Sequence, residues 1–214
     1  MIFEKIGAGG DRNFSYLIGD EESRGCAVVD PGYDTSMLEA RVQAQGLHVV
    51  YVVNTHGHHD HVAGNGVFHK GGVKLAAYRD AQTGPDVPLD HGSVIEVGRQ
   101  RIEALFTPGH YLDAMCLLVN GQKLITGDTL FVGCIGGSGF RGSSSEKQFH
   151  SLFQVILALD DAVEVYPGHD YGPTAFSTIG HERAHNPFLQ RPKFEDFVWL
   201  KEHWDEYKAE HGIP

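Results

Sequence analysis

The sequence predicts an α/β fold in which two β-sheets pack face to face between outer layers of helices. Short apolar segments rich in β-branched residues alternate with segments of helical periodicity, and the second half of the chain returns to this alternation in altered form. Residues 49–53 form a continuous apolar run, as expected for a strand buried on both faces. With 214 residues and 41% hydrophobic content, we expect one domain, 1–214, with a short helical tail at about 177–214.

The elements of the first half are bounded by turn and capping residues. The turn Asp30-Pro31-Gly32 closes the second strand, and Gly46 ends the first helix, for which Asp34 or Thr35 is the N-cap. We therefore expect strands at 14–18, 25–29 and 49–53, a helix at 35–45 and a short helix at about 60–70.

The second half begins with strands and ends with helices. Asn120-Gly121 is a strong hairpin signal between two of the strands, and the apolar residues of segment 145–159 recur with a helical period. The expected strands are 73–77, 94–97, 101–106, 114–119, 123–126 and 162–166, and the expected helices are 145–159, 177–186 and 193–210.

The segment from Thr55 to His61 is the strongest functional signal. It holds four histidines and one aspartate directly after the predicted strand 49–53. Neutral imidazole is the commonest metal ligand in proteins, and carboxylate joins it on zinc or iron. Three more candidates, His110, Asp128 and His169, each follow another predicted strand, in the kind of loop where sites are built.

These loops together supply more ligands than one ion can use. Two neighbouring ions could share them, with the two oxygens of Asp128 as a bridge. We therefore expect two divalent metal ions, Zn²⁺ in the first place, with iron or a mixed Zn/Fe pair as alternatives. The expected ligands are His56, His58, Asp60, His61, His110, Asp128 and His169.

Composition excludes several classes of function. The formal net charge is −11 and the chain has no basic stripe, so we expect no binding to nucleic acid. No apolar stretch is long enough to span a bilayer, and the first residues show no charged leader followed by an apolar segment. The three cysteines form neither a CxxC pair nor a disulfide framework. We expect a cytoplasmic protein that binds a small-molecule substrate and no membrane.

Four motifs carry a resemblance to a known family. The run HxHxDH, followed by TPGH, GDTLF and PGHDY, resembles the metallo-β-lactamase superfamily, in particular its hydroxyacylglutathione hydrolase (glyoxalase II) and persulfide dioxygenase branches. The resemblance implies a four-layer αββα sandwich with the site at one edge. It assigns His56, His58, His110 and Asp128 to metal site one, and Asp60, His61, Asp128 and His169 to site two. It leaves His59 at a variable, non-ligand position.

The resemblance leaves two reactions open. In a thioester hydrolase, two metals would activate water and polarise the carbonyl, with Asp60 and Asp128 as catalytic residues and Asp60 receiving a proton. In a persulfide dioxygenase, a single Fe(II) would be held by His56, His110 and Asp128. We favour the dinuclear hydrolase of a small thioester or ester, with the dioxygenase as the alternative. A lactonase and a non-catalytic metal scaffold are further alternatives.

The expected substrate contacts lie in two of the loops. Tyr171 matches a substrate-contacting tyrosine of the hydrolase pattern, and Arg141 could anchor an anionic end of the substrate. The loop after Asp128 lacks the Gly-Cys-Gly-Arg or Gly-Cys-Gly-Lys segment of the family, so the carrier of the substrate need not be glutathione. His181 and His185 are expected on a solvated helix face. The aromatic tail favours a homodimer.

Overall fold

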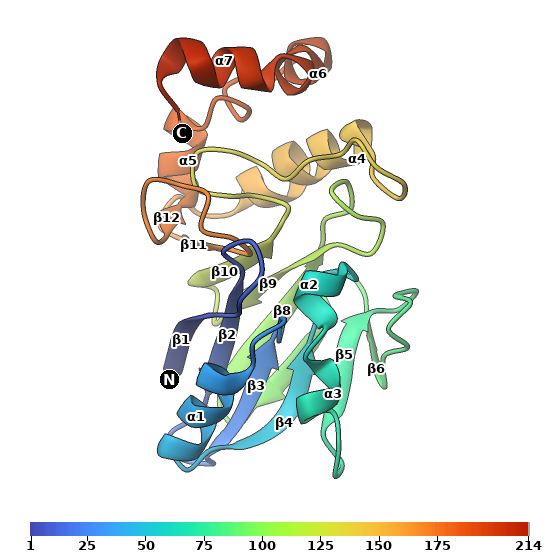
Figure 1. Ribbon diagram of the computed structural model, residues 1–214, viewed down its shortest axis with the longest axis vertical. Helices are drawn as coiled ribbons and strands as arrows, with labels where there is room; N and C mark the ends of the chain where they lie inside the picture. Colours follow the sequence, from blue (N-terminus) through green and yellow to red (C-terminus); the bar gives the residue numbers. More distant parts are fainter. Residues whose placement is uncertain (214) are drawn as a thin grey trace.

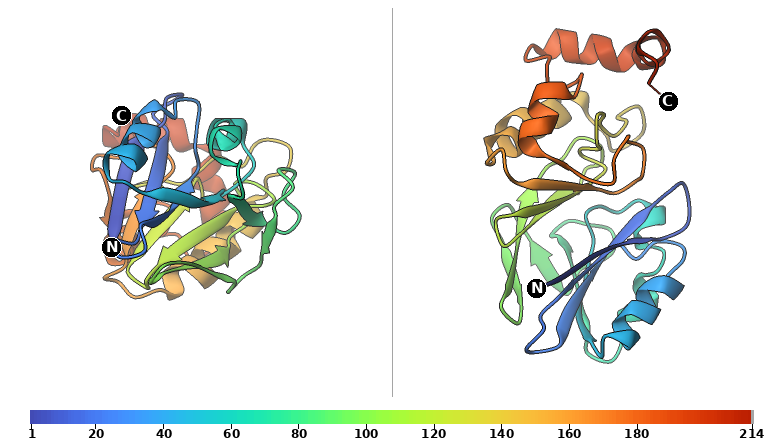
Figure 2. Two further views of the ribbon diagram at one scale, coloured as in Figure 1. Left: turned by 90° about the horizontal axis from the view of Figure 1, so that it is seen from below. Right: turned by 90° about the vertical axis from the view of Figure 1, so that its left-hand side faces the viewer.

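Residues 1–213, the part of the chain that the computed structural model describes, form two six-stranded sheets that face each other (Figures 1 and 2). The first sheet has the order β1-β2-β3-β4-β5-β6, antiparallel up to β3 and parallel from there on. Its strands are β1 (Ile2–Gly7), β2 (Phe14–Gly19), β3 (Gly25–Val29), β4 (His48–Val53), β5 (Lys74–Tyr78) and β6 (Val87–Leu89).

The second sheet has the order β12-β11-β10-β9-β8-β7 and is antiparallel except for the pair β10–β11. The hairpin predicted at Asn120-Gly121 joins β9 to β10. The strands are β7 (Val94–Val97), β8 (Gln100–Phe106), β9 (Met115–Val119), β10 (Lys123–Gly127), β11 (Glu164–Pro167) and β12 (Ser177–Thr178).

Three apolar cores separate four layers. The central core lies between the sheets and joins residues such as Val29 and Val53 to Ile102 and Leu117. A second core packs Leu38 of α1 (Ser36–Ala44) on the outer face of the first sheet, and the third packs the later helices on the second sheet. These layers are the αββα sandwich expected from the sequence.

The remaining helices are shorter than expected. The predicted helix 60–70 is two four-residue helices, α2 (His59–Val62) and α3 (Asn65–Phe68), because the chain between them is pulled against the turn after β3, where the Gly64 N–H donates to Pro31 O at 2.7 Å. Segment 145–159 starts as α4 (Ser145–His150) and continues as π-helical and 3₁₀ turns. The tail forms α5 (Ile179–His185), α6 (Phe194–Glu202) and α7 (Trp204–His211) after the short strand β12.

Three strands were not predicted as strands. β1 is a half-buried edge strand, and β6 has only three residues with Pro88 in the middle, a residue that argues against a strand in sequence reasoning. β12 has two residues, within a segment expected to be helical. No helix of residues 1–213 is both long and apolar enough to cross a bilayer.

The two sheets meet at the edge where β3, β4, β8, β10 and β11 end. Here the Phe14 N–H of the first sheet donates to Gly168 O at 2.8 Å, and the Met115 N–H of the second sheet donates to Thr55 O at 2.7 Å. Gly127 has φ of +49°, and a Cβ on it would meet Thr55, so only glycine lets β10 approach the loop after β4 this closely. The loops from both sheets are thereby brought together.

Tyr16 ties the sheets together from within. Its ring is buried, and its hydroxyl donates to the carbonyl oxygen of Pro167 at 2.5 Å. We predict that Tyr16→Phe lowers the free energy of unfolding by about 1–2 kcal/mol, because the Pro167 oxygen then stays buried without its partner. Urea unfolding measures this. Tyr51→Phe is the control: this residue is half-buried, and its hydroxyl makes no hydrogen bond within residues 1–213, so a loss equal to that of Tyr16→Phe would contradict the prediction.

Candidate metal centre

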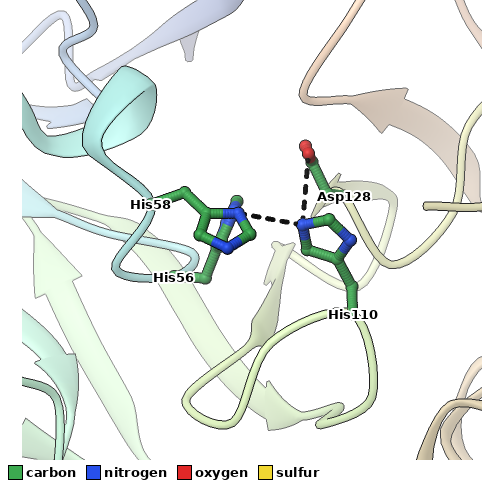
Figure 3. Close-up of side chains that lie close together, drawn as sticks. All are labelled: His56, His58, His110 and Asp128. Atoms are coloured by element: carbon green, nitrogen blue, oxygen red, sulfur yellow. Dashed lines mark hydrogen bonds and ion pairs between the residues drawn. The ribbon is translucent and has the colours of Figure 1, made fainter. Parts of the chain in front are cut away.

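The first group of predicted ligands converges at this edge (Figure 3). Nε2 of His56 and Nε2 of His110 each lie 3.0 Å from Nδ1 of His58. Oδ2 of Asp128 lies 3.5 Å from Nε2 of His110. The ligating atoms of all four residues lie within 4.8 Å of one another. Ring nitrogens whose lone pairs face one point repel each other unless a cation or a proton lies between them, so this donor set suits a metal ion.

A second group lies beside the first and is made of Asp60, His61 and His169. Nε2 of His61 is 3.2 Å from Nε2 of His169, and Oδ2 of Asp60 is 3.7 and 3.5 Å from these two nitrogens. Asp128 lies between the groups, with Oδ1 3.3 Å from His61 Nε2 and Oδ2 3.3 Å from His169 Nε2. All seven predicted ligands thus come together in two groups that share Asp128.

The charge state of Asp128 fits a cation. Its side chain is buried, and Oδ1 has no hydrogen-bond partner among the described residues. Burial would raise the pKa of this carboxyl, but the neighbouring His61 and His169 hold the pKa well below its usual range, so the group is ionised. A buried carboxylate with an unpaired oxygen is costly unless positive charge compensates it. A divalent ion at either group would do so.

The histidines of the two groups differ in protonation. Burial lowers the pKa of His110 to about 4 and holds the pKa of His56 well below its usual value, so both are neutral. Burial would also lower the pKa of His61, but the carboxylates of Asp128 and Asp30 raise it well above normal, so a cation at the second group would have to displace a proton.

Hydrogen bonds fix the ring orientation of the four buried histidines. In each ring Nδ1–H donates to an oxygen, so Nε2 is the nitrogen that faces the site. The donor–acceptor pairs are His56 to Thr55 Oγ1 (3.1 Å), His61 to Asp30 Oδ2 (3.1 Å), His110 to Gly137 O (2.9 Å) and His169 to Asp11 O (2.8 Å).

Asp30 is a site residue that the sequence analysis missed. Its carboxylate accepts the Thr55 N–H at 2.7 Å and the Thr55 hydroxyl at 2.5 Å, in addition to the His61 ring. It therefore holds both the start of the loop after β4 and the predicted ligand His61. In the sequence analysis Asp30 was interpreted only as part of a turn, although it follows a strand, as the predicted ligands His110 and Asp128 do.

Two further polar residues support the loops. The Asn13 side-chain amide donates to Oδ2 of Asp60 at 2.9 Å, and its backbone pairs with His169. Asp113 accepts the Gly57 N–H at 3.1 Å, which ties the loop after β8 to the loop after β4. The sequence did not indicate this role for either residue, because each contact joins residues that lie far apart in the chain.

Tyr171 and Arg141 lie on different sides of the centre. Tyr171 stacks on His169 with ring centroids 4.8 Å apart, donates its hydroxyl to Asp11, and lines a cavity of about 620 Å³ together with Phe131 and Cys134. Arg141 is exposed and lines a second cavity of about 500 Å³. A substrate contact at either residue remains a prediction.

The other histidines lie outside the two groups. His59 is exposed and contacts the Tyr33 hydroxyl at 3.2 Å, as suits a non-ligand position. His181 and His185 stack on each other on the exposed side of α5, and they line the larger cavity rather than the metal centre. In contrast, Phe140 and Tyr111 were not expected at the centre, yet their rings lie 5.1 and 4.3 Å from that of His58.

The fold and the paired His/Asp groups define a metallo-β-lactamase-type metalloenzyme. The sequence profile of the metallo-β-lactamase superfamily matches residues 8–82 and 69–169, and the chain belongs to this superfamily.

Within the superfamily, the chain is similar to members of both branches named above. It is 32% identical over 202 residues to the mitochondrial persulfide dioxygenase ETHE1 of Homo sapiens. This alignment covers 92% of the present chain and 78% of the human protein. The chain is 37% identical over 180 residues to a hydroxyacylglutathione hydrolase of a Polaromonas species, and this alignment covers 80% of the present chain and 67% of the Polaromonas protein. The solved structure of ETHE1 from Myxococcus xanthus superimposes with a TM-score of 0.88 at 30% identity, over 95% of this chain and 91% of that one.

We predict that Asp30→Asn weakens metal binding at the second group. The φ of Asp30 is +46°, which asparagine tolerates. However, the asparagine side chain has an NH₂ group where Asp30 has its second oxygen, so one of the donors from Thr55 or His61 would lose its acceptor. Loss of such a supporting hydrogen bond typically costs about 10- to 100-fold in metal affinity. Zn²⁺ titration against a chromophoric chelator measures this. Asp34→Asn, nearby and exposed, is the control, and equal affinities of the two variants would refute the role of Asp30.

Proposed function

We propose that the protein is an iron-dependent dioxygenase that uses molecular oxygen to oxidise the terminal sulfur of a small thiol persulfide. The observation that carries this proposal is the likeness to persulfide dioxygenases, which extends over nearly the whole chain and both sheets. It reverses the preference drawn from the sequence. The ligand types could not discriminate the two reactions, because both branches retain all seven positions.

The residues for this reaction are His56, His110 and Asp128. Two imidazoles and one carboxylate on separate loops form the ligand set typical of non-haem Fe(II) oxygenases. When bound, iron would supply the open positions at which oxygen and the substrate sulfur react. The chain holds the two rings in one tautomer through Thr55 and Gly137, and it buries the carboxylate away from water.

The substrate would enter beside His169. Tyr171 and Phe131 pack against this histidine and continue into the larger cavity, so a thiol carrier could lie there with its sulfur toward the centre. We keep Tyr171 as a substrate contact on this ground. Arg141, beside the smaller cavity next to Tyr111, would attract an anionic end of the substrate or product.

A dinuclear thioester hydrolase is the second candidate. The observation that favours it is the second group, Asp60, His61 and His169, which shares Asp128 with the first. In this reaction Asp60 would accept the proton of the attacking water. Its carboxylate is partly exposed, and the Asn13 amide donates to one of its oxygens.

Metal content and turnover together test the proposal. We expect about one iron per chain after purification without chelator or added metal, and oxygen uptake that depends on a small thiol persulfide such as that of glutathione or cysteine. Elemental analysis and an oxygen electrode measure both. Two zinc ions per chain, thioester hydrolysis and no oxygen uptake would instead establish the hydrolase.

His56 and His58 provide a matched pair of variants. For the dioxygenase we predict that His56→Ala loses iron and oxygen uptake, whereas His58→Ala keeps both within about threefold, because His58 is not one of the three ligands. The two rings are neighbours, with centroids 4.7 Å apart, so both variants remove an imidazole from the same part of the site. Equal loss of metal from the two variants would show that His58 is a ligand and would favour the dinuclear site.

A further inference from the structure

We propose that helix α5 belongs to the functional site, with Glu182 and Asn186 as positioning residues for the ligands His110 and Asp128. They act through residues 133–137, which we call the ligand-facing loop. This inference rests on the metal site of the proposed function but not on its substrate, so it holds for either reaction.

Glu182 and Asn186 form hydrogen bonds with the start of the ligand-facing loop. Oε2 of Glu182 accepts the Gly133 N–H at 2.9 Å and the Asn186 side-chain amide, also at 2.9 Å. The same amide donates to the carbonyl oxygen of Cys134 at 3.2 Å, an oxygen that also accepts the Phe131 N–H. Oδ1 of Asn186 accepts the Phe188 N–H at 3.1 Å, so the side chain has one fixed orientation.

The other end of the ligand-facing loop touches the ligands directly. Gly137 O accepts the Nδ1–H of His110. Gly136 packs so closely that a Cβ on it would clash with the backbone oxygen of Asp128 and would lie 2.7 Å from Nδ1 of His110. The loop therefore has no room to move toward the centre, and the contacts with α5 hold it from behind.

A second connection comes from the helices on the outside of the second sheet. The Gln148 side chain of α4 donates to Gly136 O at 2.8 Å, and Lys201 of α6 donates to the same glutamine. Both ends of the ligand-facing loop are thus anchored to helices, and α5 anchors the end that follows Asp128 in the chain.

The cost of this arrangement indicates that it has a role beyond stability. Glu182 and Asn186 are fully buried, and Oε1 of Glu182 has no hydrogen-bond partner among residues 1–213. These polar atoms are buried at a cost, and their hydrogen bonds go to the Gly133 N–H and the Cys134 carbonyl oxygen of the ligand-facing loop. Buried polar groups of this kind are expected where they fix one particular backbone geometry. Here that geometry is the position of the loop against His110 and Asp128.

The test uses the whole chain described above and does not require turnover. We expect Glu182→Ala to increase amide hydrogen exchange at residues 133–137 about tenfold or more and to weaken Zn²⁺ affinity about tenfold, as for other residues that support metal ligands. Glu182→Gln keeps an oxygen that can accept the Gly133 N–H, so it should restore both values to within about threefold of the unmodified chain. NMR-detected exchange and titration of Zn²⁺ against a chelator supply the readouts.

Glu206→Ala is the control, since it removes an exposed glutamate from α7, in the same tail. If Glu182→Ala matches this control in local exchange and in Zn²⁺ affinity, the positioning role is wrong. It is also wrong if exchange rises equally in the ligand-facing loop and in strands β4 and β9, because Glu182 would then contribute only to global stability. Failure of the oxygen-uptake experiment would leave these readouts unaffected, so the two proposals can fail separately.

Discussion

The ionised carboxylate of Asp128, buried between two groups of histidines, is the interaction on which the rest of the site depends. A negative charge in this position requires compensation, and the imidazoles around it provide either protons or the ligands of a cation. The polar contacts farther out follow from this requirement. Asp30, Asp11 and Gly137 each take the Nδ1–H of one ring, which leaves the opposite nitrogen turned toward Asp128.

The topology explains why such a charge can be buried at all. The strands of both sheets that carry ligands end at one edge, and short backbone contacts join the loops there. The apolar core between the sheets keeps water out below the centre, and the loop after Asp128 covers it from the side of the tail. The tail helices therefore contribute to the site. Glu182 of α5 contacts this loop directly, and Lys201 of α6 contacts Gln148 of α4, which donates to the loop.

Much of this could be predicted from the sequence, for a definite reason. Ligands such as His56 and His110 are recognisable by residue type and by their place after a strand, and those two features are local. Asp30 and Asn13 were missed because their partners, His61 and Asp60, lie 31 and 47 positions away in the chain. The edge strands β1 and β6 were missed because half-buried or proline-containing segments lack the apolar alternation of strands. The choice between dioxygenase and hydrolase could not be made from ligands that both reactions share.

The distribution of the ligands along the chain has a consequence for how the protein folds. Four of the seven, His56 to His61, lie within six residues, whereas His110, Asp128 and His169 reach them only after both sheets have docked. We therefore expect this short segment of the unfolded chain to bind zinc or copper before the other predicted ligands are in place. Free metal present during synthesis would stabilise this unfolded segment and slow refolding, whereas the same metal added afterwards would stabilise the native state. We therefore expect the yield of active protein to depend on whether metal is added before or after folding.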